Sequence, residues 1–320
     1  MELIIIIFGA LVLDWILGDP QVSFHPVALI GKLAMMLENP IRKIVKIDFA
    51  AGMICSVIVI AIPATLAYLF VTMTLELNYW TGIFVSVFCV YISVALKSLI
   101  SHSKAIESPL RQDNLEKARQ MVGRIISRDT CVLDETGVTR SCLESVGENI
   151  IDGITAAIFY ATVGWLICGP AGAAAAALLY RSSNTLDATF GYKNERYKHF
   201  GTFPARLDDI LNFIPARLTL LAIYLAAFLL GMRANNALRC AWNDKYKHPS
   251  PNSTWGMASF AGALGVELGG PTRYKGRWKE YPNWGLKFEE LSIKHIKQAN
   301  QLAVMTTIIF AILMLGVIFI

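Results

Sequence analysis

Three long apolar runs constrain this chain more than any other feature. They cover Ala50–Leu75, Trp80–Leu99 and Leu302–Ile320, and each can cross the hydrocarbon core of a bilayer, which is about 30 Å thick. Inside hydrocarbon, backbone polar groups must bond within the segment, which helices achieve. The chain is also 55% hydrophobic and only 17% charged, outside the range of a soluble globular protein. The sequence therefore predicts an all-α, polytopic helical membrane protein, with 1–320 as a single integral membrane domain.

Three further segments are apolar but less regular. Leu3–Leu17 carries Asp14, and Leu218–Met232 is only about 22 Å long at 1.5 Å per residue. Residues 154–179 are interrupted by Gly169-Pro170, and proline breaks a helix. We expect two half-length helices that form a re-entrant hairpin there, with one kinked span as the alternative.

Basic residues predict the orientation. The segment 97–152 carries eight Lys or Arg and the segment 233–297 carries eleven, whereas the connection around Glu76 and Asn78 has none. Lys and Arg are enriched in cytoplasmic loops. We therefore expect a multi-pass protein of the inner (cell) membrane, with its polar motifs facing the cytoplasm and cytoplasmic helical loops between the spans.

Several classes of site are not indicated. The net charge of +5 is small for 320 residues, so the footprint of a nucleic-acid-binding protein is missing. The six cysteines form no CxxC pair, so neither a zinc site nor a disulfide framework is predicted. No Walker A, GxGxxG, HExxH or GxSxG motif occurs. A bound nucleotide would therefore be held without a standard loop.

An acidic stripe precedes the interrupted apolar segment. Arg140, Glu144, Glu148 and Asp152 recur every four residues, so on a helix they share one face. Stacked carboxylates repel each other. A Mg²⁺ ion held by Glu144, Glu148 and Asp152 with substrate phosphate oxygens would compensate. The alternative is a solvated face paired to Arg140 and other basic residues.

Two more polar clusters are candidates for binding. Around Gly123–Thr130, arginine and hydroxyl side chains suit a phosphate or carboxylate, although an ordinary helix end is the alternative. Between residues 180 and 217, dense polar residues are flanked by apolar segments, where they are costly unless paired or functional. The residues singled out are Arg124, Arg128 and Asp129 in the first cluster, and Asn184, Asp187, Lys193, Arg206, Asp208, Asp209 and Arg217 in the second.

Two loop motifs complete the set. Proline and glycine fix turns around Asp19 and His25, where His25 is a candidate proton acceptor or a structural residue. Asn252 lies in a Ser-Pro-Asn turn that precedes a glycine-rich stretch. Those glycines allow close approach of the backbone to a ligand or to another helix.

These motifs, in this order, resemble the adenosylcobinamide-phosphate synthase family, the CbiB/CobD-type cobalamin biosynthesis proteins. The resemblance covers nearly the whole chain. It is carried by GDP-x-x-x-x-HPV at 18–27, GR-x-x-x-RDT at 123–130, ES-x-x-EN-x-x-DG at 144–153, N-x-LD at 184–187, GYK at 191–193, ARLDD-x-LN-x-IPAR at 205–217, SPN at 250–252 and LGGP-x-x-Y at 268–274.

The resemblance implies an ATP- and Mg²⁺-dependent carbon-nitrogen ligase. Such an enzyme would join a propionate of adenosylcobyric acid, a corrinoid, to (R)-1-amino-2-propanol or its O-phosphate through an acyl phosphate. It implies Mg²⁺ at Glu144, Glu148 and Asp152, phosphates at Arg124, Arg128 and Arg206, and amine-proton acceptance by Asp208 or Asp209. Further catalytic candidates are Asn184 and Asp187, and further substrate-binding candidates are Asp129, Lys193, Arg217, Asn252, Asp19 and His25.

Two functions of other classes compete with the ligase. A transporter would place polar residues within its spans rather than between them. A sensory membrane protein of the AmpE-like type would have the fold without the acidic stripe. Partners expected of the ligase are the corrinoid, the aminopropanol compound, the lipid bilayer and other cobalamin-assembly membrane enzymes.

Overall fold

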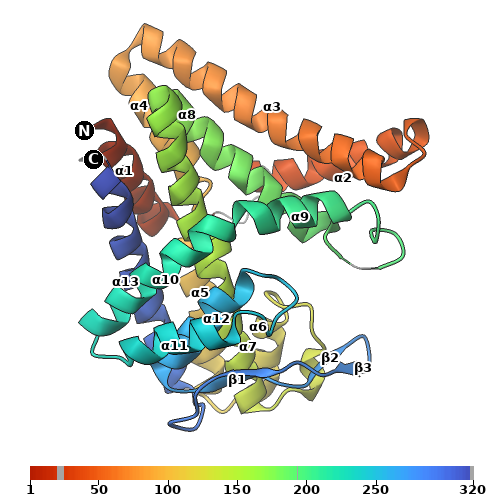
Figure 1. The fold of residues 1–320 in the computed structure, drawn as a ribbon, viewed down its shortest axis with the longest axis vertical. Coiled ribbons are helices and arrows are strands. Elements are labelled where there is room, and N and C mark those ends of the chain that lie inside the picture. Colours follow the sequence, from red (N-terminus) through yellow and green to blue (C-terminus); the bar gives the residue numbers. More distant parts are fainter. Residues whose placement is uncertain (20–24, 193, 318–320) are drawn as a thin grey trace. The chain divides into compact units, whose positions relative to one another are not determined.

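The computed structural model describes residues 1–19, 25–192 and 194–317 (Figure 1). The prediction for Lys193 and the end of the 302–320 run lie outside the described residues. Most of the chain is helical, so the predicted fold class is confirmed. Four helical stretches are long and apolar enough to cross a membrane, and five if α9 and α10 count as one.

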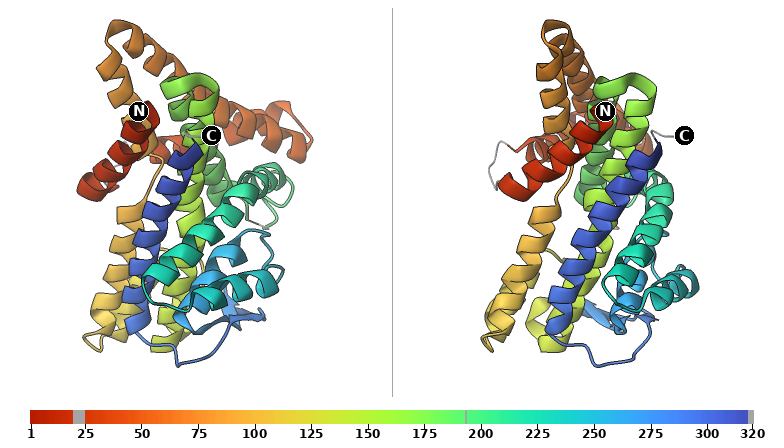
Figure 2. Two further views of the ribbon diagram at one scale, coloured as in Figure 1. Left: turned by 60° about the vertical axis from the view of Figure 1, so that its left-hand side comes forward. Right: turned by 90° about the vertical axis from the view of Figure 1, so that its left-hand side faces the viewer.

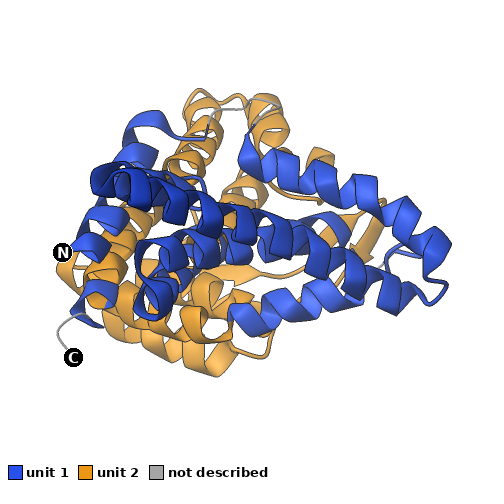
Figure 3. Ribbon diagram, turned by 90° about the horizontal axis from the view of Figure 1, so that it is seen from above, with its two compact units in different colours: residues 1–95, 152–212, 314–320 blue, residues 96–151, 213–313 orange. Residues whose placement is uncertain are grey.

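The chain divides into two compact units that alternate along the sequence (Figure 3). Unit 1 comprises residues 1–95, 152–212 and 314–320, and unit 2 comprises 96–151 and 213–313. That the two act as the single domain predicted from the sequence stays a prediction.

Unit 1 is built around a long apolar helix, α3, which packs against α2, α4, α8 and α9. Its 30 residues include the first predicted span, and α4 begins the second. Helix α1 packs against α4 and α8. The helices of this unit are α1 (Glu2–Leu17), α2 (Pro26–Ile44), α3 (Asp48–Leu77), α4 (Tyr79–Tyr91), α8 (Ala156–Phe190) and α9 (Thr202–Leu211).

Helix α8 turns back on itself where the sequence places Gly169-Pro170 (Figure 2). The backbone is non-helical at Cys168 and at Gly169, whose φ of 59° favours glycine. The two arms pack closely, since a Cβ built on Gly164 would lie 2.1 Å from the carbonyl oxygen of Gly172. The predicted helical hairpin is therefore present, and its re-entry from one membrane face stays a prediction.

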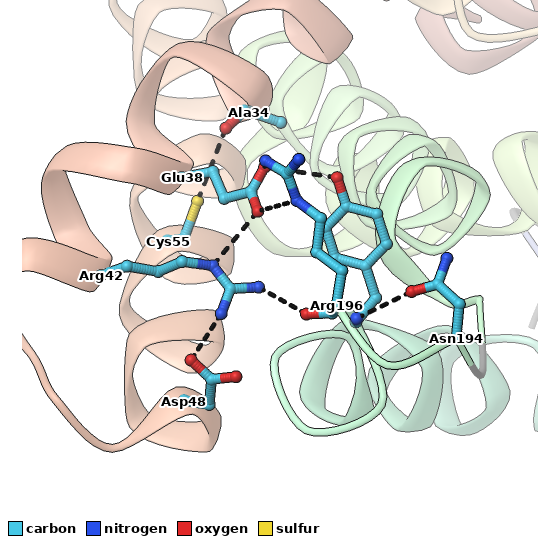
Figure 4. Close-up of polar contacts among 8 residues, drawn as sticks. Ala34, Glu38, Arg42, Asp48, Cys55, Asn194 and Arg196 are labelled. Carbon is cyan, nitrogen blue, oxygen red and sulfur yellow. Dashed lines mark hydrogen bonds and ion pairs between the residues drawn. The ribbon is translucent and has the colours of Figure 1, made fainter.

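A buried carboxylate fastens the connection between α8 and α9 to α2 (Figure 4). Glu38 is 2% exposed and accepts two hydrogen bonds of 3.0 Å from Arg196 and one of 3.1 Å from Arg42. Arg42 also pairs with Asp48 at the start of α3 and lies over the ring of Phe200. The contacts fix the chain just before α9 begins.

Unit 2 packs its helices around α12, in which every residue is buried. Helix α12 contacts α7, α10 and α11, and small residues allow these contacts. A Cβ built on Gly256 would lie 1.8 Å from the carbonyl oxygen of Gly147. The helices are α5 (Leu96–Leu110), α6 (Leu115–Val122), α7 (Glu135–Ile150), α10 (Phe213–Leu229), α11 (Ala234–Asp244), α12 (Ser253–Leu264) and α13 (Lys294–Gly316).

Four short strands form two antiparallel pairs in unit 2, a feature that the sequence did not indicate. Strand β1 (Glu267–Gly269) pairs with β4 (Asn283–Gly285), and β2 (Thr272–Tyr274) pairs with β3 (Arg277–Lys279). The β2–β3 turn has positive φ at two adjacent residues, as a tight hairpin requires. Strands of three residues are too short to leave a period-2 pattern.

Candidate functional site

The acidic stripe lies on α7, a helix that starts where Asp134 accepts the N–H of Gly137. Glu144 faces inward and is 2% exposed. Its Oε2 lies 2.5 Å from Nη1 of Arg128, while its Oε1 accepts the backbone N–H of Gly269 at 2.7 Å. Burial would lower the pKa of Arg128, but Glu144 and Tyr274 outweigh burial and raise it. Glu144 is thus a buried partner of an arginine from the GR-x-x-x-RDT motif.

The next carboxylate on this face meets the start of α12. Glu148 is half-buried, and its Oε1 accepts a 2.8 Å hydrogen bond from the Ser253 hydroxyl. The neighbouring Asn252 accepts a 3.0 Å hydrogen bond from Arg217, whose guanidinium lies over the rings of Phe213 and Trp255. Asn252 of the Ser-Pro-Asn motif and the following Ser253 therefore contact α10 and α7 at the start of α12.

His248 is a member of this cluster that sequence reasoning missed. Its Nδ1 accepts the backbone N–H of Ser250 at 3.2 Å, and its ring stacks on Tyr281. Burial lowers its pKa, although the nearby carboxylates of Glu148 and Glu144 oppose this effect. A neutral imidazole with Nε2–H as donor follows from these contacts. Position in the sequence gave no signal, because His248 is separated from α7 by about a hundred residues.

Asp129 has a structural role that the sequence did not reveal. Its two carboxylate oxygens accept the backbone N–H groups of Lys275 and Gly276, at 2.9 and 2.6 Å. These are the two turn residues of the β2–β3 hairpin, and Arg273 on β2 pairs with the same carboxylate. Asp129 therefore holds the hairpin against the loop that carries Arg128. Its role in substrate binding stays a prediction.

The carboxylates do not assemble into a ready metal cage. Across residues 1–19, 25–192 and 194–317, no three His, Cys, Asp or Glu side chains are grouped so that they could hold a metal ion. Glu144 is engaged by Arg128 rather than by Arg140, and it is buried rather than solvated. Glu148, whose Oε1 accepts the Ser253 hydroxyl, fits the single carboxylate that a Mg²⁺–phosphate complex needs.

Unit 1 contains a second polar cluster, on α8 and α9. Asp208 is 7% exposed, and its two oxygens accept amide N–H groups from Asn184 at 3.3 Å and from Asn212 at 3.0 Å. Asp187 and Asp209 lie within electrostatic range of the same carboxylate. The carboxylates and the amide predicted from N-x-LD and ARLDD are therefore together, and Asn212 joins them.

Two buried side chains of α8 extend this cluster. The Tyr180 hydroxyl has two acceptors in reach of its single proton, the Asn212 side-chain oxygen at 2.8 Å and the carbonyl oxygen of Asp152 at 3.0 Å. Arg181 donates to the carbonyl oxygens of Ser93 and Gly153 and to Asn184. An arginine directly after an apolar helix arm was a visible signal for this network.

Other predicted residues lie outside these clusters. Arg124 and Arg206 are exposed, and no contact gathers them with the residues above. His25 Nε2 lies 3.3 Å from Asp19. Asp152 follows α7 in a five-residue π-helical turn, so the predicted four-residue repeat ends at Glu148. The assignments to substrate and metal stay predictions.

Comparison with known proteins settles the family. The sequence model described as CobD/Cbib protein matches residues 7–303. The chain belongs to the CobD/CbiB family. A CobD cobalamin biosynthesis protein of Leptospira interrogans is 41% identical over 300 residues, covering 94% of this chain and 93% of the relative. A CobD protein of Clostridium perfringens is 37% identical over 91% of this chain and 90% of its own length.

A CbiB protein of Salmonella typhimurium is 35% identical, covering 95% of this chain and 94% of the relative. No solved structure matches the chain. As a CobD/CbiB protein, the chain is a cobalamin biosynthesis protein with membrane-spanning helices. The resemblance found in the motifs is thereby confirmed at the level of the family.

Proposed function

We propose that this CobD/CbiB protein is an adenosylcobinamide-phosphate synthase. It would join the free carboxylate of adenosylcobyric acid to the amine of (R)-1-amino-2-propanol or of its O-phosphate, with consumption of ATP. The observation that carries the proposal is the unit 2 cluster. It gathers Arg128, Glu144, Glu148 and Asn252, which come from three separate family motifs, on one side of α7.

The chemistry needs an activated carboxylate, because a carboxylate and an amine do not condense in water unaided. A carboxylate oxygen of the corrinoid attacks the terminal phosphorus of ATP, and ADP leaves. The amine nitrogen then attacks the acyl carbon, inorganic phosphate leaves, and the amine loses a proton. Arginines stabilise the charge on the transferring phosphoryl group.

The two polar clusters contain residues whose chemistry suits this reaction. In unit 2, the half-buried guanidinium of Arg128 would bind phosphate, and Glu148 would hold Mg²⁺ together with phosphate oxygens. Bound Mg²⁺ would neutralise phosphate charge. In unit 1, Asp208 is the carboxylate assigned to accept the proton, and Asn184 and Asn212 hold its two oxygens in a fixed orientation.

The test uses the full chain purified in detergent, with ATP and Mg²⁺. ATP consumption should require both adenosylcobyric acid and the amine. Separate reactions with free aminopropanol and with its O-phosphate identify the amine partner. ATP consumption that is independent of the corrinoid would contradict the proposal, as would uptake of unmodified corrinoid by vesicles, which would indicate a transporter.

A further inference from the structure

Arg140 is a guanidinium in unit 2 whose charge is not matched by an acidic side chain. It lies one helical turn before Glu144 on α7, where an i, i+4 ion pair would be expected. Glu144 is instead paired with Arg128. Among the described residues, no ion pair includes Arg140, and its Nη2 donates only a long hydrogen bond of 3.5 Å to Pro271.

The inner edge of this guanidinium is buried without an acceptor. Nε of Arg140 is shielded from solvent and has no hydrogen-bond partner in the described part of the chain. A buried donor without an acceptor costs free energy, and more so when it carries charge. Such a donor is satisfied when a ligand brings an acceptor oxygen.

A glycine with positive φ lies against the tip of Arg140. Gly270 has a φ of 84°, and a Cβ built there would lie 3.3 Å from Arg140 Nη1 and 2.9 Å from the Asn283 side-chain oxygen. The preceding Gly269 donates its N–H to Glu144. The Gly-Gly-Pro turn thus packs against two successive turns of α7 through backbone alone.

Two further basic side chains lie in this part of unit 2, together with Glu144 and Glu148. Arg128 and Lys279 both lie within electrostatic range of His248, and Arg128 also approaches Ser141, the residue after Arg140. A phosphoryl group carries nearly two negative charges and accepts the parallel N–H groups of an arginine. It matches this surrounding better than an uncharged ligand does.

We propose that Arg140 and the Gly269-Gly270-Pro271 turn form a phosphoryl-binding subsite of unit 2. The inference rests on the proposed function and deepens it by naming a residue that holds a phosphorylated substrate. The phosphoryl group comes either from ATP or from the O-phosphate of the amine. The same chemistry serves both, so the experiment has one arm for each.

The test measures the binding of single compounds, so that no turnover is needed. Full-length wild-type protein and the Arg140→Met variant are titrated calorimetrically in detergent with ATP, with aminopropanol O-phosphate and with free aminopropanol. Arg140→Met should weaken one of the two phosphorylated compounds at least about tenfold and leave the free amine unchanged. The compound that weakens identifies the source of the phosphoryl group.

Two further variants keep the test sharp. Arg239→Met removes an exposed arginine of α11 and should bind all compounds as the wild type does. Arg140→Lys keeps the charge but loses the planar fork, so it should bind the same compound more weakly than wild type. The binding test uses Arg140→Lys alone if the purified Arg140→Met protein is not monodisperse.

The outcomes separate this inference from the proposed function. The subsite is wrong if the wild type binds neither phosphorylated compound, or if the Arg140 variants bind both with unchanged affinity. If the Arg140 variants bind phosphorylated compounds as the wild type does and the wild type forms the amide product, the subsite is wrong and the ligase stands. If phosphate binding depends on Arg140 but no amide product forms, the ligase is wrong and the subsite stands.

Discussion

Nη1 of Arg128 lies 2.5 Å from Oε2 of Glu144, and this pair ties the loop after α6 to the buried face of α7. Removing one partner of a buried pair leaves an uncompensated charge. Arg128→Met should therefore lower the free energy of unfolding by about 3 kcal/mol or more. Thermal unfolding of the purified protein measures this loss.

The double variant Arg128→Met/Glu144→Leu is the matched control. It removes both charges, so most of the lost stability should return, less about 1 kcal/mol for the Gly269 N–H that loses its acceptor. Ligase activity should stay low, because Arg128 is assigned to phosphate. If the double variant is as unstable as Arg128→Met, the contribution of Arg128 to stability does not come from its pair with Glu144.

The half-buried imidazole of His248 gives unit 2 a dependence on pH. Burial lowers its pKa from 6.5, so the folded protein binds a proton there less readily than the unfolded chain. The stability contribution is fully present above the unfolded pKa and is lost as the pH falls through the folded pKa. His248→Gln should reduce the fall in Tm that the wild type shows as the pH is lowered from about 8 to about 5. Identical acid sensitivity in the two proteins would contradict the assignment.

Much of the fold followed from simple patterns. Apolar length identified the spans, and Gly169-Pro170 identified the break in α8 because both residues have strong backbone preferences. The spacing of Glu144 and Glu148 placed them on one face of α7. These inferences depend only on neighbours in sequence.

The partners of those residues could not be predicted. Gly269 lies 125 residues from Glu144, whose carboxylate it binds, and Arg128 takes the place that spacing alone gives to Arg140. Likewise, the N–H groups that hold Asp129 come from a hairpin whose strands are too short to detect. These contacts join residues that are far apart in the sequence. They therefore leave no local periodic pattern from which they could be predicted.

Cys131 tests the orientation of unit 2. It is exposed and lies in the basic segment expected in the cytoplasm. In a Cys168→Ser background, a membrane-impermeant thiol reagent should label Cys131 in inverted vesicles and not in intact cells. Cys142 is fully buried and should stay unlabelled in both. Labelling of Cys131 from outside the cell would reverse the predicted orientation.

Glu148→Gln tests the carboxylate proposed for Mg²⁺. Glutamine keeps an acceptor oxygen for Ser253 but removes the charge. Activity should fall at least about tenfold, or roughly 1.4 kcal/mol of transition-state stabilisation, and raised Mg²⁺ should restore part of it. Glu290→Gln, at a side chain that is 85% exposed, should change neither the activity nor its dependence on Mg²⁺. Unchanged activity and metal dependence in Glu148→Gln would leave this residue a purely structural role.

The most direct measurement is the mass of the corrinoid after incubation with purified protein, ATP, Mg²⁺ and the amine. The wild type should yield adenosylcobyric acid that is heavier by one amide-linked aminopropanol unit or its phosphate. Asp208→Asn turns one oxygen into a donor that faces the amide of Asn184 or Asn212, and it should lower product formation at least about a hundredfold. A wild-type protein that leaves the corrinoid mass unchanged while the substrates are bound would contradict the ligase.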